Sequence, residues 1–184
     1  MASSPSIKLA CIVVLALGCA ASHAQSTRVR GTITSFDGTR LTVGQHEIRV
    51  DEKTEIVFAK PMSSGDIRPG DFLAITSVKR PDGTLAAYEV RRFPKPLNPG
   101  HRPFEGREDQ TMTNATVGAM VQSTRGRELT MTYEGGAQKI VLPENASISA
   151  LVPGERSQLV PGAPVNFTMD ANRVAQRIQV GPKP

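Results

Sequence analysis

The sequence repeats itself once, and this repeat limits the possible folds more than any other feature. Ile67-Arg68-Pro69-Gly70 and Leu159-Val160-Pro161-Gly162 share the pattern aliphatic-x-Pro-Gly at a separation of 92 residues. The same separation relates four further pairs, which are Ile48 and Ile140, Val50 and Leu142, Ile56 and Ile148, and Pro61 and Pro153. Self-similarity at several positions in one order indicates a duplicated structural unit.

The separation shrinks toward both ends of the repeat, where turn segments tolerate insertions. Three more matches carry the alignment outward: Leu41 with Leu129 at 88 residues, Gly31 with Gly118 at 87, and Tyr88-Glu89-Val90 with Gln176-Arg177-Ile178 at 88. We therefore take residues 28–93 and 115–181 as two copies of one unit.

Each copy is predicted to consist of short strands. Val29, Gly31 and Ile33 alternate with polar residues, which is the period of a half-buried strand. Asp37-Gly38 and Asp82-Gly83 are typical of hairpin turns. Each copy has about six short strands. Unpaired strand edges are unfavourable, and a copy that curls into a small barrel leaves few of them. We expect an all-β protein with two tandem OB-like barrels, one per copy; their strand order stays open.

A leader segment precedes the repeat. Lys8 gives it a positive start, residues 9–17 form an apolar stretch, and Ser22-His23-Ala24 places small residues at the positions that a signal peptidase reads. The apolar stretch is too short to span a membrane as a stable anchor. We therefore predict a signal peptide over residues 1–24 and a periplasmic protein that begins at Gln25.

Both cysteines of the chain, Cys11 and Cys19, lie in this leader. Ala16-Leu17-Gly18-Cys19 loosely resembles a lipobox, but Ala16 and Leu17 stand in reversed order. We expect a soluble product, with a lipid anchor at Cys19 as the alternative. A processed chain without thiols excludes cysteine nucleophiles, thiolate metal sites and disulfides.

The charge and composition exclude two further classes of protein. The net charge is +5, and removal of Lys8 with the leader lowers it to about +4. Basic residues are scattered and aromatic residues make up only 4% of the chain, so nucleic acid is not an expected partner. Beyond the leader no apolar run is long enough to cross a bilayer, so an integral membrane protein is not expected.

The motif residues of the first copy resemble a known family. They are Val29-x-Gly31-x-Ile33, Gly38-x-x-Leu41-x-Val43, Thr54-x-Ile56, Ile67-x-Pro69-Gly70-x-x-Leu73 and Leu85-x-Ala87-x-x-Val90. This pattern is similar to a widespread exported bacterial domain of unknown function, found in periplasmic or lipoprotein contexts and often in tandem. The resemblance implies fold and export, and it implies no activity, because the motif consists mainly of structural glycines and core aliphatic residues.

Residues 94–114 separate the copies and are predicted to form a stiff, irregular, proline-rich connector. It holds the candidate site residues, because loops on rigid scaffolds often carry function. His101, Glu105 and Asp109 are candidate ligands of a cation. Arg102 and Arg107, on either side of Phe104, are candidates for contact with an anion or a partner. The alternative is a solvated spacer with Phe104 tucked against one barrel.

We find no catalytic residues and expect no cofactor. The two histidines that follow the leader, His46 and His101, lie in no recognisable triad motif, and no glycine-rich phosphate loop is present. We therefore expect a non-enzymatic envelope protein, a binding or scaffolding module whose partner is an unknown envelope protein or small ligand. A metal-handling accessory protein that uses the connector around His101, and binding of oligosaccharide or cell wall, are the alternatives.

Overall fold

The computed structural model describes residues 26–123 and 126–183, and the chain is all-β there, as predicted. Two short 3-10 helices, η1 (Ser64–Asp66) and η2 (Arg156–Gln158), interrupt the strands. The described residues include no helix of the length and apolarity that a membrane crossing requires. The predicted signal peptide, with Cys19, lies outside the described residues.

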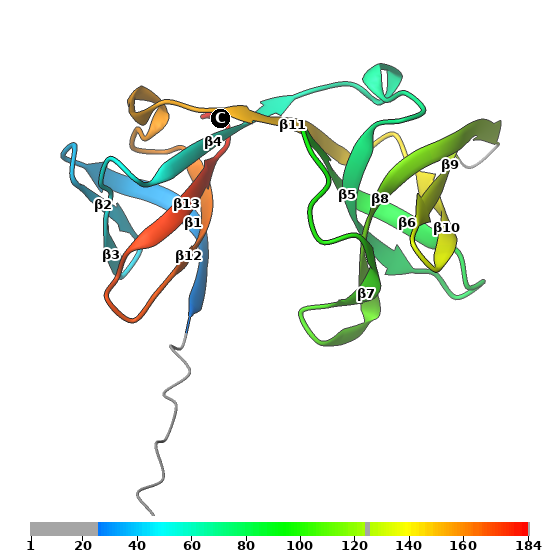
Figure 1. Cartoon of the computed structure of the whole chain (residues 1–184), viewed down its shortest axis with the longest axis horizontal. Helices are drawn as coiled ribbons and strands as arrows, with labels where there is room; N and C mark the ends of the chain where they lie inside the picture. Colours follow the sequence, from blue (N-terminus) through cyan, green and yellow to red (C-terminus); the bar gives the residue numbers. More distant parts are fainter. Residues whose placement is uncertain (1–25, 124–125, 184) are drawn as a thin grey trace, which may run out of the picture.

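Five strands form the first lobe, on the left of Figure 1. Their order in space is β3 (His46–Arg49), β2 (Arg40–Val43), β1 (Thr27–Phe36), β12 (Pro164–Met169) and β13 (Ala175–Val180). A parallel bridge between Arg49 and Val174 connects the start of β13 back to β3. The five strands therefore return on themselves.

The second lobe has the same arrangement. Its order is β10 (Gly136–Leu142), β9 (Gly126–Tyr133), β8 (Arg107–Ser123), β5 (Phe72–Lys79) and β6 (Leu85–Phe93). Parallel pairing of Ile140 with Leu85 and of Val141 with Ala86 closes β10 onto β6. Arg49 and Val174 of the first lobe stand at the positions of Val141 and Ala86 in the repeat, so the two lobes close in the same way.

Each lobe contains strands from both copies, and the expectation that each copy closes on itself is wrong. β1 of the first copy pairs with β12 of the second, and β8 of the second pairs with β5 of the first. The exchange follows from the two strands that cross the molecule, β4 (Glu55–Pro61) and β11 (Ser147–Pro153). Both strands end in a proline, which keeps the residue before it extended. The chain therefore continues into the other lobe instead of folding back.

The crossing strands show the symmetry of the duplication. β4 and β11 pair antiparallel, and Ala59 pairs with Leu151, which lies 92 residues further along and is its counterpart in the repeat. An approximate two-fold axis therefore passes between these two residues, as in a dimer that has exchanged identical segments. Figure 1 shows the two lobes side by side, joined along one side of the molecule by these strands.

The backbone hydrogen bonds correct one match of the sequence repeat. Ile33 and Val117 each exchange hydrogen bonds with the residues of the Pro-Gly turn opposite them, at 2.8 to 2.9 Å, so they are equivalent. This register places Ala115, rather than Gly118, at the position of Gly31. Gly118 lies in a bulge between the paired residues Val117 and Ala119, whereas Gly31 pairs regularly with β12.

Each lobe has its own apolar core, and both cores draw on both copies. In the first lobe Leu41 and Ile48 pack with Ile178, and in the second lobe Leu73 and Ile75 pack with Leu129. A smaller apolar cluster of Val57, Ala59 and Leu151 lies on the crossing strands. Since burial of apolar surface is the main stabilising term in folding, neither core is complete without both copies.

The connector differs from the expected irregular spacer. Residues 94–99 are irregular, whereas β7 (Gly100–Phe104) forms a hairpin with the long strand β8. Pro103 is tolerated because proline, which lacks an N–H group, is accepted on an edge strand. From Gln110 onward β8 also pairs with β5, so the end of the connector belongs to the second lobe.

Candidate ligand-binding cleft

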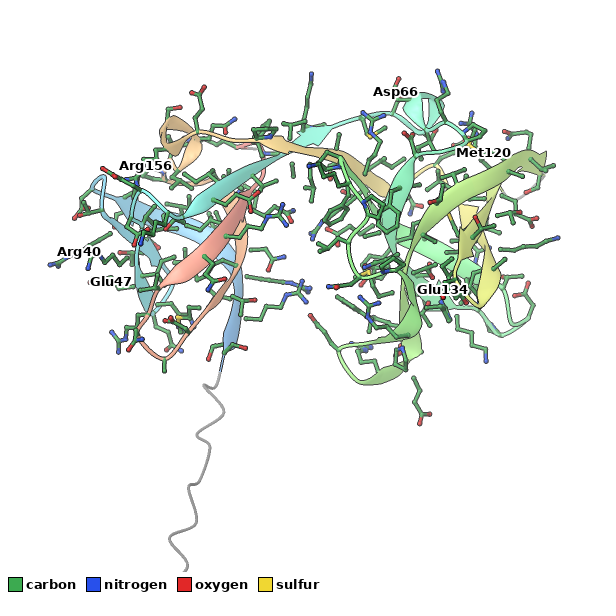
Figure 2. The ribbon with its side chains drawn as sticks, in the orientation of Figure 1. Arg40, Glu47, Asp66, Met120, Glu134 and Arg156 are labelled. Carbon is green, nitrogen blue, oxygen red and sulfur yellow. The ribbon has the colours of Figure 1, made fainter. Side chains whose placement is uncertain are left out.

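Three neighbouring hollows lie where the lobes face each other. Residues of both lobes line the second and the third, and the first is lined by the first lobe together with Leu97 and Asn98 of the connector. Their volumes are about 610, 390 and 400 Å³. Arg28 lines the first and the third, Glu89 and Arg91 line the second and the third, and Asn166 lines the first and the second. These shared residues join the hollows into one cleft. Figure 2 shows side chains of both lobes projecting into the space between them.

Arg28 and Arg30 supply most of the positive charge on the first-lobe side of the cleft. Alternation along β1 buries Val29 and Ile33 in the core and turns the arginines outward on the same side of the strand. The residues at these positions in β8 are Met112 and Asn114, according to the register of the lobes. The arginine pair therefore belongs to one copy only.

The tip of the β7–β8 hairpin meets these arginines from the second lobe. An oxygen of the Glu105 carboxylate, Oε1, lies 2.9 Å from Nη2 of Arg30 and 3.5 Å from Nη1 of Arg28. Both guanidinium groups also lie over the ring of Phe104, with distances to the ring centroid of 5.4 Å for Arg30 and 5.9 Å for Arg28. Phe104 is only 7% exposed, so the hairpin tip is anchored by a buried ring.

The backbone at Glu105 is unusual for a glutamate. Glu105 and Gly106 form the turn of the hairpin, with φ angles of 52° and 73°. A two-residue hairpin turn with two positive φ angles favours Asn-Gly or Gly-Gly. The left-handed region costs a residue with a Cβ atom roughly 1 to 2 kcal/mol.

Stability alone does not account for a glutamate at this position. The Arg28, Arg30 and Glu105 side chains are each 44% exposed, and a salt bridge this exposed contributes at most about 1 kcal/mol. Unusual backbone conformations cluster at functional sites. The ion pair across the cleft is therefore a candidate functional feature rather than a simple stabilising contact.

Positive charge around Arg28 is only partly compensated. Partial burial lowers the pKa of Arg28, and the neighbouring charge of Arg30 lowers that pKa further, while the carboxylate of Glu105 opposes both effects. Arg91 adds to the repulsion and is itself paired with Glu89. Because a guanidinium group stays protonated in proteins, the surroundings of Arg28 favour a further anion.

The three candidate metal ligands are not brought together. His101 lies with Nδ1 2.8 Å from Oγ1 of Thr113, and burial lowers its pKa. Glu105 contacts the arginines of β1, and Asp109 pairs with Arg107 at 3.2 Å. Within residues 26–123 and 126–183, no three side chains of His, Cys, Asp or Glu lie close enough to hold a metal ion.

The candidate contact residues separate into two groups. Arg102 and Phe104 line the cleft, and Arg102 donates a hydrogen bond to the backbone oxygen of Asn98 at 3.3 Å. Arg107 pairs with Asp109 along the hairpin instead of flanking Phe104. The cations over Phe104 are Arg28 and Arg30, which were not among the site residues predicted from the sequence. A comparison of the copies in the correct register would have found them, because their counterparts are uncharged.

These features define a two-lobed all-β protein with an arginine-lined cleft. Residues 30–91 match the family model described as Domain of unknown function (DUF5666), which confirms the resemblance of the first copy to a domain family of unknown function. No curated protein and no solved structure matches the chain significantly. The matched segment begins on β1 in the first lobe and ends on β6 in the second, so residues of this one segment line both sides of the cleft.

Proposed function

We propose that the protein is a non-enzymatic binding module of the bacterial cell envelope, which holds its ligand in the cleft between the lobes. The observation that carries this proposal is the row of three adjoining hollows, two of which are lined by residues of both lobes. Ligand sites in proteins are concave, and they occur preferentially where two domains meet.

We further propose that each lobe is a small OB-like barrel. Support comes from the five strands per lobe, from closure through a parallel pair, and from the non-sequential strand order. OB folds are five-stranded, partly open Greek-key barrels whose surfaces bind extended ligands. The cleft would then lie between two barrel walls, formed by β1, β12 and β13 on one side and by β8, β5 and β6 on the other.

Export to the periplasm is the second part of the proposal. It is supported by the leader pattern in residues 1–24 and by the absence of cysteine from residues 25–184. Fractionation of bacteria that express the full chain should recover a periplasmic protein that begins at Gln25 by mass spectrometry. An uncleaved cytoplasmic protein would contradict export, and a lipid-modified N-terminal Cys19 would establish the anchored alternative.

Binding in the cleft can be tested by NMR with defined probes. The processed protein, labelled with ¹⁵N, is titrated separately with citrate, inorganic pyrophosphate and chitotetraose. We expect at least one probe to shift the amide signals of cleft residues such as Arg30, Glu89 and Asn166. Shifts confined to the outer hairpins of the lobes, or no shifts with any probe, would contradict the proposal.

The metal-handling alternative has less support. Its candidate ligands Glu105 and Asp109 are paired with arginines, and His101 contacts Thr113. Calorimetry with Zn²⁺, Ni²⁺, Mn²⁺ and Ca²⁺ decides between the two proposals, because binding heat that is lost in His101→Ala would favour the metal site. Binding of oligosaccharide or cell wall is tested by the chitotetraose arm of the NMR experiment.

A further inference from the structure

We infer that Arg28 and Arg30 form a carboxylate-binding site in the cleft, which the side chain of Glu105 occupies until an acidic ligand displaces it. This inference rests on the proposed binding function and specifies the ligand as a molecule that carries carboxylate groups. It also assigns Glu105 a role as an internal competitor of that ligand.

The geometry at Glu105 is that of a bound carboxylate. One oxygen lies near guanidinium nitrogens of two arginines, at 2.9 and 3.5 Å, and the ring of Phe104 lies beneath both cations. Hydrogen bonds between guanidinium and carboxylate groups are among the strongest that side chains form. The site therefore already holds the chemical group that we assign to the ligand.

Positive charge around the site is not fully neutralised, so the site can attract a second anion. Arg30 and Arg91 lie near Arg28 and add to the positive charge there, and Glu89 and Glu105 oppose it. Nearly half of the Arg28, Arg30 and Glu105 side chains is exposed, so a dissolved ligand can reach them. A ligand with two or more carboxylates can pair with the arginines that one glutamate satisfies only in part.

Glu105 can leave the site while the fold stays intact. It lies in the two-residue turn at the tip of a hairpin, beyond Gln110, where the pairing of β8 with β5 ends. The neighbouring Phe104 is buried and holds the hairpin in place. Displacement therefore requires a rotation of one side chain and no opening of the lobe.

The contact between Glu105 and the two arginines is not part of the structure that the two copies share. The hairpin tip lies outside both copies of the repeat, and the positions equivalent to Arg28 and Arg30 carry Met112 and Asn114. A feature needed to fold the repeated unit would occur twice. The contact between the arginine pair and Glu105 occurs once, which points to a task specific to this cleft.

The test measures citrate binding at low ionic strength by NMR titration of four proteins: the unaltered protein, Glu105→Gln, Arg30→Gln and the control Glu108→Gln. Glu108 lies on the same hairpin and, among the described residues, forms no salt bridge with Arg28 or Arg30. An internal competitor on a short tether acts at millimolar effective concentration. We therefore expect Glu105→Gln to bind citrate up to about fivefold more tightly, Arg30→Gln at least tenfold more weakly, and Glu108→Gln as the unaltered protein does.

Three other results of these titrations would each overturn a specific part of the inference. Equal affinities of Glu105→Gln and Glu108→Gln would overturn the role of Glu105 as an occupant. Citrate binding in the cleft that survives Arg30→Gln and the double variant Arg28→Lys/Arg30→Lys would overturn the arginine site and leave the proposed function standing. Tighter binding of pyrophosphate than of citrate by Glu105→Gln would overturn the assignment to carboxylates. Amide spectra that superimpose away from the cleft establish that the variants are folded.

Discussion

At the scale of single residues, Gly31 shows how closely the first lobe is packed. A Cβ atom at Gly31 would lie 2.8 Å from Cγ1 of Val43, a buried side chain with a stiff, branched rotamer. We predict that Gly31→Ala lowers the free energy of unfolding by about 1 to 3 kcal/mol, as overpacked substitutions do. Urea denaturation measures this loss.

Gly118→Ala provides the matched comparison. Its Cβ atom would approach Cγ2 of Thr132 at 3.1 Å, and Thr132 is exposed and free to adjust. The loss should therefore be smaller than at Gly31. A loss at Gly118 equal to that at Gly31 would contradict the tighter packing that we assign to Gly31.

His101 gives a prediction for the pH dependence of stability. Because burial lowers the pKa of His101, the unfolded chain takes up a proton near the ordinary pKa of 6.5, while the folded protein still holds His101 neutral. Stability therefore falls as the pH drops through about 6.5 and levels off below the folded pKa. His101→Gln should flatten this part of the profile, measured by urea denaturation between pH 7.5 and 5. An unchanged slope would contradict the prediction.

At the scale of strands, the crossing of β4 and β11 is the element on which the architecture depends. Leu151 is 5% exposed and packs on the approximate two-fold axis against Val57 and Ala59. We predict that Leu151→Ala lowers the free energy of unfolding by about 2 to 5 kcal/mol, since it removes buried methyl groups at the junction. Val160→Ala, at a half-exposed position in a turn, should cost less than 1 kcal/mol by the same measurement.

The strands also show what the sequence could and could not predict. Alternation of apolar and polar residues correctly predicted β1, because one side of that strand faces a core. The partners of the strands could not be predicted, because the duplication gives β5 and β12 similar apolar patterns and either can pair with β1. The β7–β8 hairpin was missed because Glu105-Gly106 is not a common turn sequence and prolines precede it.

The candidate site, too, could be predicted only in part from the sequence. The sequence predicted candidate site residues in the connector, and three of them, Arg102, Phe104 and Glu105, do line the cleft. It could not indicate that β1 lies opposite the hairpin tip, since that contact exists only because the copies exchange strands. The repeat could have singled out Arg28 and Arg30, but the match of Gly31 with Gly118 shifted the comparison by three residues.

At the scale of the whole molecule, strand exchange makes the lobes dependent on each other. Each core contains residues of both copies, so loss of either copy removes part of both cores. We predict one cooperative unfolding transition, with the same midpoint for amide signals of the two lobes followed by NMR in urea. Two separate midpoints would indicate that the lobes fold independently.

The exchange also explains the cleft. Two self-closed units joined by a flexible connector would hold no fixed space between them, whereas β4 and β11 tie the lobes together along one side. The fixed cleft therefore depends most on whether β1 pairs with β12 of the other copy or with β5 of its own.

Two alternative cysteine pairs distinguish these arrangements in a processed chain that has no other thiol. Arg28 is paired with Thr168 of β12, and in a self-closed copy Thr76 would take the place of Thr168. Paired residues of antiparallel strands are close enough for a disulfide. We predict that Arg28→Cys/Thr168→Cys forms an intramolecular disulfide on mild oxidation, read by mass spectrometry of peptides, and that Arg28→Cys/Thr76→Cys does not. A disulfide in the second variant and none in the first would contradict the exchanged fold and the cleft built on it.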